Sequence, residues 1–253
     1  MREIITPLDL LKHEGVPPER VAMPPNVVMC HQPPLVKAIS ERAGAKPRPD
    51  WPFQNEPYSV VDGSYRGVPF SMFISRITGA PAAALRIEEL GAAGGRRFIG
   101  VNAVGSLDAG LPLGSLVVPI LCYRDEGTSS HYLPCGGPAV PSDFMVRLML
   151  DTARDLGITV TRTHHWTTDG LYRELKPQVD YYRRLGVVSV DMETSAMYAV
   201  CWLRGFQAVN LGVVCNYVTD PWKPAYLDEG FANGLKAAAE LVLETLARLP
   251  EGK

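Results

Sequence analysis

The chain has 253 residues, of which 46% are hydrophobic and 21% charged, and its formal net charge is -2. This length and composition suit one globular domain of the larger α/β kind. The 25 Lys and Arg residues nearly balance the 27 Asp and Glu residues, so the chain lacks the basic surface that nucleic acids and acidic lipids require. We therefore expect neither nucleic acid nor membrane as a partner.

The cysteines are odd in number, widely scattered and free of C-x-x-C spacing. They are Cys30, Cys122, Cys135, Cys201 and Cys215. This pattern argues against a disulfide framework and against a zinc site. No apolar signal-peptide core follows Met1, and no run of residues reaches transmembrane length. We expect reduced thiols, a cytoplasmic protein and no bound metal.

In chain order, residues 1–25 are rich in proline and predict an irregular leader with one short helix at 8–13. Strands are then expected at 26–30, 58–65, 68–75, 97–101, 115–121, 158–163, 187–190 and 206–214. Helices are expected at 35–43, 80–90, 143–156, 176–185, from 196 onward, and at 227–249. The alternation predicts one domain over 26–253, with a mostly parallel, twisted central sheet flanked by helices on both faces.

The most informative stretch is the junction after the strand at 187–190. There the sequence Asp191-Met192-Glu193 joins a buried strand to an apolar helix, a position where open α/β sheets bind ligands. A carboxylate in apolar surroundings needs a hydrogen-bonding partner, and the two hydroxyls of a sugar diol provide one. The same two acids are also explained without a ligand, because Asp191 can cap the following helix and Glu193 is favoured in its first turn. Spacing alone does not decide between ligand binding and helix capping.

The segment Asp191-Met192-Glu193-Thr194-Ser195-Ala196 resembles E-M-E-[ST]-A of the nucleoside phosphorylase superfamily, which includes purine nucleoside and uridine phosphorylases and methylthioadenosine-type nucleosidases. Similar blocks lie at 98–118, 124–132 and 212–216, in the family's order. The resemblance extends from about residue 25 almost to the end. It implies a nucleoside phosphorylase-like fold, cleavage of the N-glycosidic bond of a nucleoside, no cofactor, and a homo-oligomer, either a dimer or a trimer of dimers.

The resemblance also implies roles for single residues. Glu193 would hold the ribose 2′- and 3′-hydroxyls and Met192 would pack beneath the sugar, while Asp191 replaces a longer acid and either caps the helix or contacts the ligand. Asn216 stands where purine-type members often carry an acid. An amide binds an oxo-purine or a pyrimidine but cannot donate a proton as an acid, so adenine is disfavoured. Asp220 is the candidate for the missing acid, unless it is a solvated loop residue.

The segment 168–172 resembles the family's S-D-x-F-Y base pocket. Thr168, Leu171 and Tyr172 are therefore predicted to contact the base, with Tyr172 compensating for the aromatic side chain that Leu171 lacks. His164 and His165 precede this segment, and for this histidine pair we favour a structural role over a catalytic one.

The segment 124–132 resembles R-x-D/E-G-x-S-x-H-[YF] of uridine phosphorylases, which shapes the active-site mouth and a subunit contact. We expect Arg124 to pair with Glu126, and His131 and Tyr132 to approach the ligand of the same or a neighbouring subunit.

The phosphate-binding positions of the family have changed together. His31 replaces a glycine, Leu35 and Gly100 replace two arginines, and Ala103 replaces a hydroxyl residue. A phosphate dianion needs charge-assisted donors, for which Arg48, Arg66 and Arg76 are the remaining candidates.

Without such donors water is the natural nucleophile, and the matching pocket positions His31, Gln32, Asn102 and Gly105 would surround it. We therefore favour hydrolysis over phosphorolysis. A non-catalytic nucleoside-binding or storage protein is the third interpretation, and the retained pair Met192-Glu193 argues against it.

Overall fold

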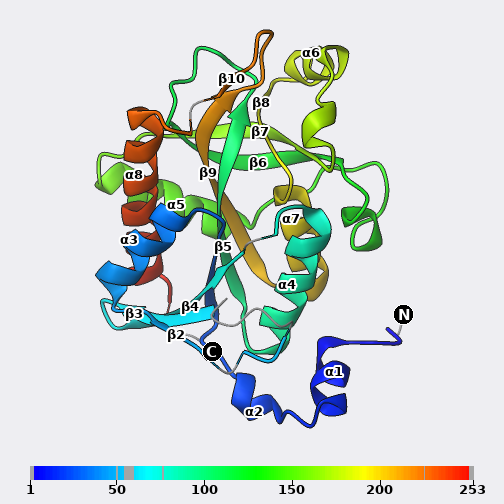
Figure 1. Cartoon of the computed structure of the whole chain (residues 1–253), viewed down its shortest axis with the longest axis vertical. Coiled ribbons are helices and arrows are strands. Elements are labelled where there is room, and N and C mark those ends of the chain that lie inside the picture. Colours follow the sequence, from blue (N-terminus) through cyan, green and yellow to red (C-terminus); the bar gives the residue numbers. More distant parts are fainter. Residues whose placement is uncertain (1–2, 50, 54–59, 76, 225, 251–253) are drawn as a thin grey trace.

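The structure is a computed structural model and describes residues 3–49, 51–53, 60–75, 77–224 and 226–250. The helices are α1 (Pro7–His13), α2 (Pro18–Val21), α3 (Pro33–Ala43), α4 (Ala80–Ala92), α5 (Asp143–Asp155), α6 (Lys176–Arg184), α7 (Thr194–Arg204) and α8 (Glu229–Ala247). The strands are β1 (Asn26–Cys30), β2 (Lys46–Pro47), β3 (Val60–Tyr65), β4 (Val68–Ile74), β5 (Arg97–Ser106), β6 (Leu116–Asp125), β7 (Val160–Thr168), β8 (Val187–Asp191), β9 (Gln207–Tyr217) and β10 (Lys223–Pro224). Two single 3-10 turns, η1 (Ser129–His131) and η2 (Leu171–Arg173), complete the elements (Figure 1).

The strands form one sheet in the order β10-β9-β6-β7-β8-β5-β1-β4-β3-β2, and an additional β9–β5 pairing closes β5, β9, β6, β7 and β8 into a ring. Parallel pairing links β4, β1, β5 and β9 on one side, and β6, β7 and β8 on the other. The ring closes because β5 is long and irregular at Val104/Gly105, so its first half pairs with β1 and its end pairs with β8.

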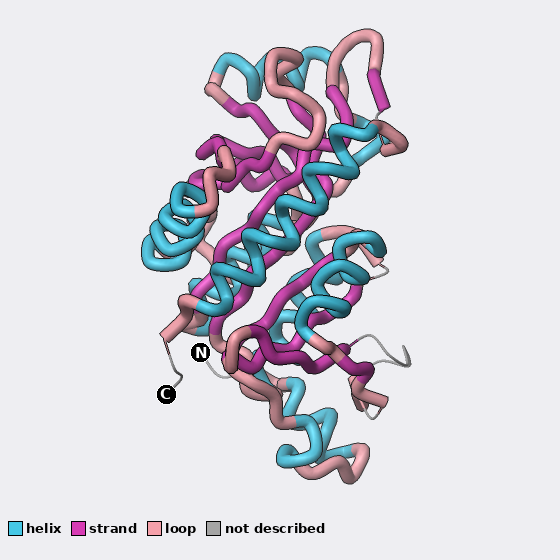
Figure 2. The backbone as a smooth tube through the Cα atoms, turned by 90° about the vertical axis from the view of Figure 1, so that its left-hand side faces the viewer, coloured by secondary structure: helices cyan, strands magenta, loops and turns pink. Residues whose placement is uncertain are grey.

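Helices cover both faces of this sheet. Figure 1 shows α3, α5 and α8 on one side of β5 and β9, and α4 and α7 on the other. In Figure 2, the long helix α8 crosses obliquely over the strands. The expected single-domain α/β fold, with a mostly parallel central sheet between two helical layers, is therefore confirmed. The ring was not predicted.

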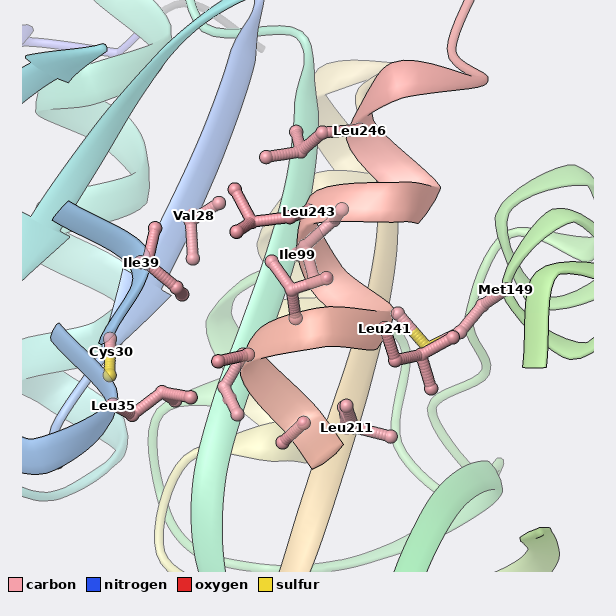
Figure 3. Close-up of a cluster of buried hydrophobic side chains, with 14 of the residues drawn as sticks. Val28, Cys30, Leu35, Ile39, Ile99, Met149, Leu211, Leu241, Leu243 and Leu246 are labelled. Carbon is pink, nitrogen blue, oxygen red and sulfur yellow. The ribbon is translucent and has the colours of Figure 1, made fainter. Parts of the chain in front are cut away.

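The alternation of side chains along the strands explains the two layers. In β1, Val28 and Cys30 belong to the cluster with α3, α5 and α8, while Val27 and Met29 pack with α4 and α7. Figure 3 shows the first cluster, where leucines of α8 meet Val28 and side chains of the neighbouring strands. Each fully buried aliphatic side chain of this kind contributes roughly 1.5–3 kcal/mol. A strand buried on both faces is what a parallel sheet requires.

The predicted elements are largely confirmed, although four strands are longer than expected. The hairpin turns at Arg66 and Gly67, both with positive φ, as a two-residue turn demands. Strands β5, β6, β7 and β9 continue through 102–106, 122–125, 164–168 and 215–217, beyond the expected strand ends. Polar side chains there resemble loop sequence, but the closed ring keeps their backbone paired. Part of the predicted loop 44–57 and the start of the strand at 58–65 lie outside the described residues.

The leader contains α1 as predicted and also α2, which was not predicted. Leu11 and Val21 are buried in the cluster that α4 and α7 form, and Met23 donates its backbone N–H to Ala93 at the end of α4. The described part of the leader therefore packs on the domain.

Candidate active site

A cavity of about 580 Å³ opens where β1, β5, β8 and β9 end. Its volume lies in the range of small-molecule sites. Many predicted site residues line it, namely His31, Gln32, Asn102, Gly105, Leu171, Tyr172, Asp191, Met192, Glu193 and Asn216. Further lining residues that the sequence analysis did not place in the site include Thr78, Glu174, Cys215, Trp222 and Tyr226. The junction after β8 is thus part of a cavity large enough for a nucleoside.

Two carboxylates share one amide in the wall of this cavity. Asn102 Nδ2 donates to Asp191 Oδ2 at 2.9 Å and to Glu193 Oε2 at 3.2 Å. The backbone N–H of Gly79 donates to Glu193 Oε1 at 2.7 Å. Asn102 lines the cavity, and its amide holds the two acids in place; its predicted position beside the nucleophile stays a prediction. Glu193 is therefore fixed by two donors from distant parts of the chain.

Asp191 also receives the hydrogen bonds of a helix cap. Its Oδ1 accepts from the backbone N–H groups of Glu193 at 3.2 Å and Thr194 at 3.1 Å, and Oδ2 accepts from the Thr194 hydroxyl. The N-cap residue of α7 is Glu193, so Asp191 binds the backbone at the helix start from two residues before the cap, and the same side chain lines the cavity.

A buried histidine lies behind Asp191. His165 Nε2 is 2.9 Å from Asp191 Oδ1, and its Nδ1 is 2.8 Å from Ser189 Oγ, which in turn is 3.1 Å from Thr163 Oγ1. His165 is completely buried and does not line the cavity. It therefore supports Asp191 from the core, which fits the structural role that the sequence favoured.

The two neighbouring acids titrate in opposite directions. Burial raises the pKa of Glu193 to about 8, and the negative charge of Asp191 adds to the rise. Burial alone would raise the pKa of Asp191 as well, but the charge and hydrogen bond of His165, together with the Thr194 bonds, hold it well below its usual range. At neutral pH, therefore, Asp191 is ionised and Glu193 is mostly protonated.

Replacement of Glu193 by glutamine is expected to remove a pH dependence of stability. The unfolded chain releases this proton near 4.5, whereas the folded protein holds it until about 8, so stability from this group falls as pH rises through that interval. Glu193→Gln should unfold like the wild type at pH 4 and be more stable at pH 9 by on the order of 4 kcal/mol, as measured by thermal unfolding. Equal stability of the two proteins at pH 9 would contradict the raised pKa.

A second polar group lies farther along the cavity. Asn216 is a residue of β9, not of the loop after it, and its Nδ2 donates to Tyr226 Oη at 3.3 Å. Its Oδ1 is buried without a hydrogen-bond partner among the described residues. A Cβ at Gly105 would lie 2.9 Å from that oxygen, so only glycine leaves it room. The unpaired carbonyl oxygen is ready to accept a hydrogen bond from a ligand.

The strand register fixes the distance between these two groups. On β5, Asn102 pairs with Gly212 and Gly105 pairs with Asn216. Three residues along a strand span about 10 Å, which is close to the length of a nucleoside from its ribose hydroxyls to the far edge of its base. The carboxylates and Asn216 can therefore bind the two ends of one such molecule.

The predicted phosphate positions are uncharged or closed. A Cβ at Gly100 would lie 2.4 Å from Asn210 Oδ1, so an arginine does not fit there. The described cavity lining contains no Arg or Lys, and His31, whose Nδ1 is buried and unpaired, is its one basic side chain. Burial lowers the pKa of His31, against the opposing charge of Asp191.

The candidate arginines do not fill this gap in the described structure. Arg48 is bound to Asp62 at 2.7 Å, and Arg66 to Glu244 at 2.7 Å; neither lines the cavity. Arg76 lies outside the described residues.

Two other predicted site residues, Thr168 and Asp220, lie outside the cavity lining. Thr168 ends β7 away from the cavity lining and accepts a hydrogen bond from Gly170 N–H, so it orders the η2 turn instead. Asp220 is exposed and does not line the cavity, although its neighbour Thr219 does. β9 ends at Tyr217, and the chain leaves the cavity lining after Thr219 until Trp222.

The loop at 124–132 supports the site from outside. Arg124 donates to Ser129 Oγ and to the carbonyls of Leu133, Pro134 and Gly137. The expected pairing of Arg124 with Glu126 is therefore wrong. Glu126 instead accepts from the Ser195 hydroxyl at 2.8 Å and so ties the loop to the start of α7. His131 and Tyr132 do not line the cavity of this chain. Their contact with a neighbouring subunit's ligand stays a prediction.

The described residues contain neither a candidate metal site nor a helix that could span a membrane. No group of three or more His, Cys, Asp and Glu side chains there could hold a metal ion. None of the described helices combines the length and apolar character needed to cross a membrane.

Comparison with known proteins identifies the family. The model of the phosphorylase superfamily matches residues 25–247. A guanosine phosphorylase of Halorubrum lacusprofundi is 28% identical over 64% of this chain and 66% of its own length. A uridine phosphorylase of Thermococcus kodakarensis is 29% identical over 77% of this chain and 72% of its own. The chain thus spans about two thirds of the curated relatives that it matches.

Solved structures agree with the fold. The purine nucleoside phosphorylase of Toxoplasma gondii, in complex with immucillin-H, superposes with a TM-score of 0.81 over 90% of this chain and 92% of its own, at 21% identity. The uridine phosphorylase of Vibrio fischeri superposes with a TM-score of 0.78 over 91% of this chain and 95% of its own, at 26% identity. The protein therefore belongs to the phosphorylase superfamily and has the nucleoside phosphorylase fold.

Proposed function

We propose that this protein is an enzyme that cleaves the N-glycosidic bond of a nucleoside, with Glu193 as the residue that holds the ribose. The observation that carries the proposal is the cavity position of Glu193, buried next to Met192 and fixed by Asn102 and Gly79. Such a bond breaks through an oxocarbenium-like sugar, so an enzyme gains most by orienting the hydroxyls and the departing base.

The charge state of Glu193 fits this role. A ribose diol donates hydrogen bonds, and ionised Glu193 accepts them more strongly than the protonated form. Binding of the diol therefore releases the proton of Glu193, and the resulting carboxylate also stabilises positive charge that develops on the sugar. The neighbouring Asp191 stays ionised because His165 and the helix cap hold it.

The base is expected to be an oxo-purine or a pyrimidine. The unpaired Asn216 Oδ1 accepts a hydrogen bond from a ring N–H, which these bases carry next to a carbonyl. Trp222, Tyr172 and Tyr226 line the same cavity and offer apolar surface to a planar ring.

We favour phosphate as the acceptor of the ribosyl group, because the two relatives described above are named phosphorylases. The altered phosphate-binding positions had favoured water over phosphate as the acceptor, and the names of these relatives reverse that preference. Water is the second candidate, and it is favoured by the closed position at Gly100 and the lack of Arg and Lys in the described cavity lining. A phosphate would need a cation from Arg76 or from a neighbouring subunit, and the homo-oligomer itself stays a prediction.

One experiment separates these reactions. The purified protein is incubated with inosine, guanosine, uridine and adenosine, with and without phosphate, and free base and sugar product are measured. Base release that requires phosphate and yields ribose 1-phosphate is the expected result. Release of free ribose at the same rate in both buffers would establish hydrolysis. Binding of a nucleoside without any turnover would favour the non-catalytic interpretation.

A further inference from the structure

One acid of the cavity has no role in the site described so far. Glu174 follows the η2 turn, is half-buried and lines the cavity. Within the described residues, its carboxylate makes no ion pair and no hydrogen bond. Burial raises its pKa to about 7, with no nearby cation to oppose the rise. Glu174 is therefore divided between its protonated and ionised forms near neutral pH.

Glu174 lies near the Asn216 end of the cavity. Burial is the main cause of the raised pKa values of Cys215 and Tyr226, and the charge of Glu174 contributes to both. Cys215 precedes Asn216 in β9, and Tyr226 accepts the hydrogen bond of the Asn216 amide. Glu174 thus belongs to the group at Asn216, about 10 Å along β5 from the level of Asn102 and the paired carboxylates.

We propose that Glu174 is the general acid that protonates the departing base. This assignment rests on the proposed function, and it supplies the acid that Asn216 cannot be. Asp220 is exposed outside the cavity, and Glu193 lies at the ribose end. A general acid works best when its pKa is close to the working pH, which Glu174 satisfies.

Glycosidic bond cleavage is coupled to proton transfer from Glu174. The C1′–N bond breaks and its electron pair goes to the base nitrogen, while the carboxyl proton of Glu174 goes to the base, which leaves neutral. An oxygen of hydrogen phosphate, or of water in the second candidate reaction, bonds to C1′. The proton that this acceptor loses passes to solvent, and a solvent proton restores the carboxyl group of Glu174.

The test compares two nucleosides with different leaving groups. Inosine needs a proton on its base, whereas 7-methylinosine has a cationic base that leaves without one. We expect Glu174→Gln to lower kcat/KM by about a hundredfold for inosine and by less than about threefold for 7-methylinosine. Glu240→Gln, an exposed acid of α8, is the matched control and should leave both rates unchanged.

The pH profile gives an independent measurement on the wild type. Its kcat/KM for inosine should fall above about pH 7 relative to that for 7-methylinosine, because only the first reaction needs protonated Glu174. The other titratable groups that face the cavity are His31, Tyr172, Asp191, Glu193, Cys215 and Tyr226. Because these groups act on both substrates, the ratio of the two profiles isolates the acid once the ionisation of 7-methylinosine at its own ring N–H, measured in the absence of protein, has been subtracted.

The outcomes are distinct. Equal losses on both nucleosides, or none on inosine, would overturn the role of Glu174 while leaving nucleoside cleavage intact. A pH-independent ratio in the wild type would do the same, even if the variant failed to fold. A wild type that cleaves uridine but neither purine nucleoside would overturn the role of Glu174 on oxo-purines, and one that cleaves none of the three would overturn the proposed function and this assignment with it.

Discussion

Replacement of Glu193 by alanine is expected to lower kcat/KM for a ribonucleoside by about a thousandfold. Two hydrogen bonds from the ribose diol to a carboxylate are lost, each contributing roughly 1.5–3 kcal/mol. The variant also leaves the Asn102 amide and the Gly79 N–H without the acceptor that they now share. The measurement is steady-state kinetics with a ribonucleoside and its 2′-deoxy analogue.

The comparison of the two sugars makes this prediction specific. Wild-type protein should prefer the ribonucleoside, and Glu193→Ala should lose most of that preference because the group that reads the hydroxyl is gone. Glu240→Ala, at an exposed position of α8, controls for the loss of an acid as such. If the variant retained the full preference for ribose, Glu193 would not be the ribose-binding residue.

The position of Glu193 was predictable because the relevant signal is local. A β-branched strand, two acids and an apolar helix follow one another within the segment 187–204, and the backbone then places Glu193 at a cavity edge. The same holds for Met192, which follows from the same junction. Local sequence patterns of this kind also gave most helices and strands of the fold.

What surrounds Glu193 was not predictable in the same way. Asn102 is 91 positions away and reaches the carboxylate only because β5 pairs with both β8 and β9 in a closed ring. That ring depends on the irregular pairing at Val104/Gly105, which has no clear signature in one sequence. The sequence alone therefore does not predict that the amide of Asn102 donates to both Asp191 and Glu193.

Glu174 and Thr168 illustrate opposite errors of motif matching. Thr168 fits a family motif, yet it ends a strand and bonds locally to Gly170. Glu174 fits no motif, yet the η2 turn brings it into the cavity. A sequence motif predicts where a residue lies along the backbone. Which side chain lines the cavity depends on turns and on strands that are distant in the sequence.

Replacement of His165 by leucine is expected to destabilise the protein by about 3 kcal/mol, because it removes the imidazole nitrogen that lies 2.9 Å from the buried carboxylate of Asp191. The loss of the Ser189 contact adds to this effect. Because the pKa of Asp191 lies well below its usual range, the stabilisation is present above about pH 4 and is lost as pH falls further. Denaturant unfolding should therefore show a large difference in the free energy of unfolding between variant and wild type at pH 6. At pH 3 this difference should be smaller.

A double-variant cycle separates this pairing from simple loss of packing. Asp191→Asn removes the charge that needs compensation, so His165→Leu should be less harmful in that background, with a coupling of about 2 kcal/mol. If the pair also positions the site, His165→Leu should raise KM for a ribonucleoside, because Asp191 holds the Asn102 amide that binds Glu193. Strictly additive effects on stability would show that His165 and Asp191 do not stabilise each other, and that the donors Asn102, Thr167 and Thr194 satisfy this carboxylate without His165.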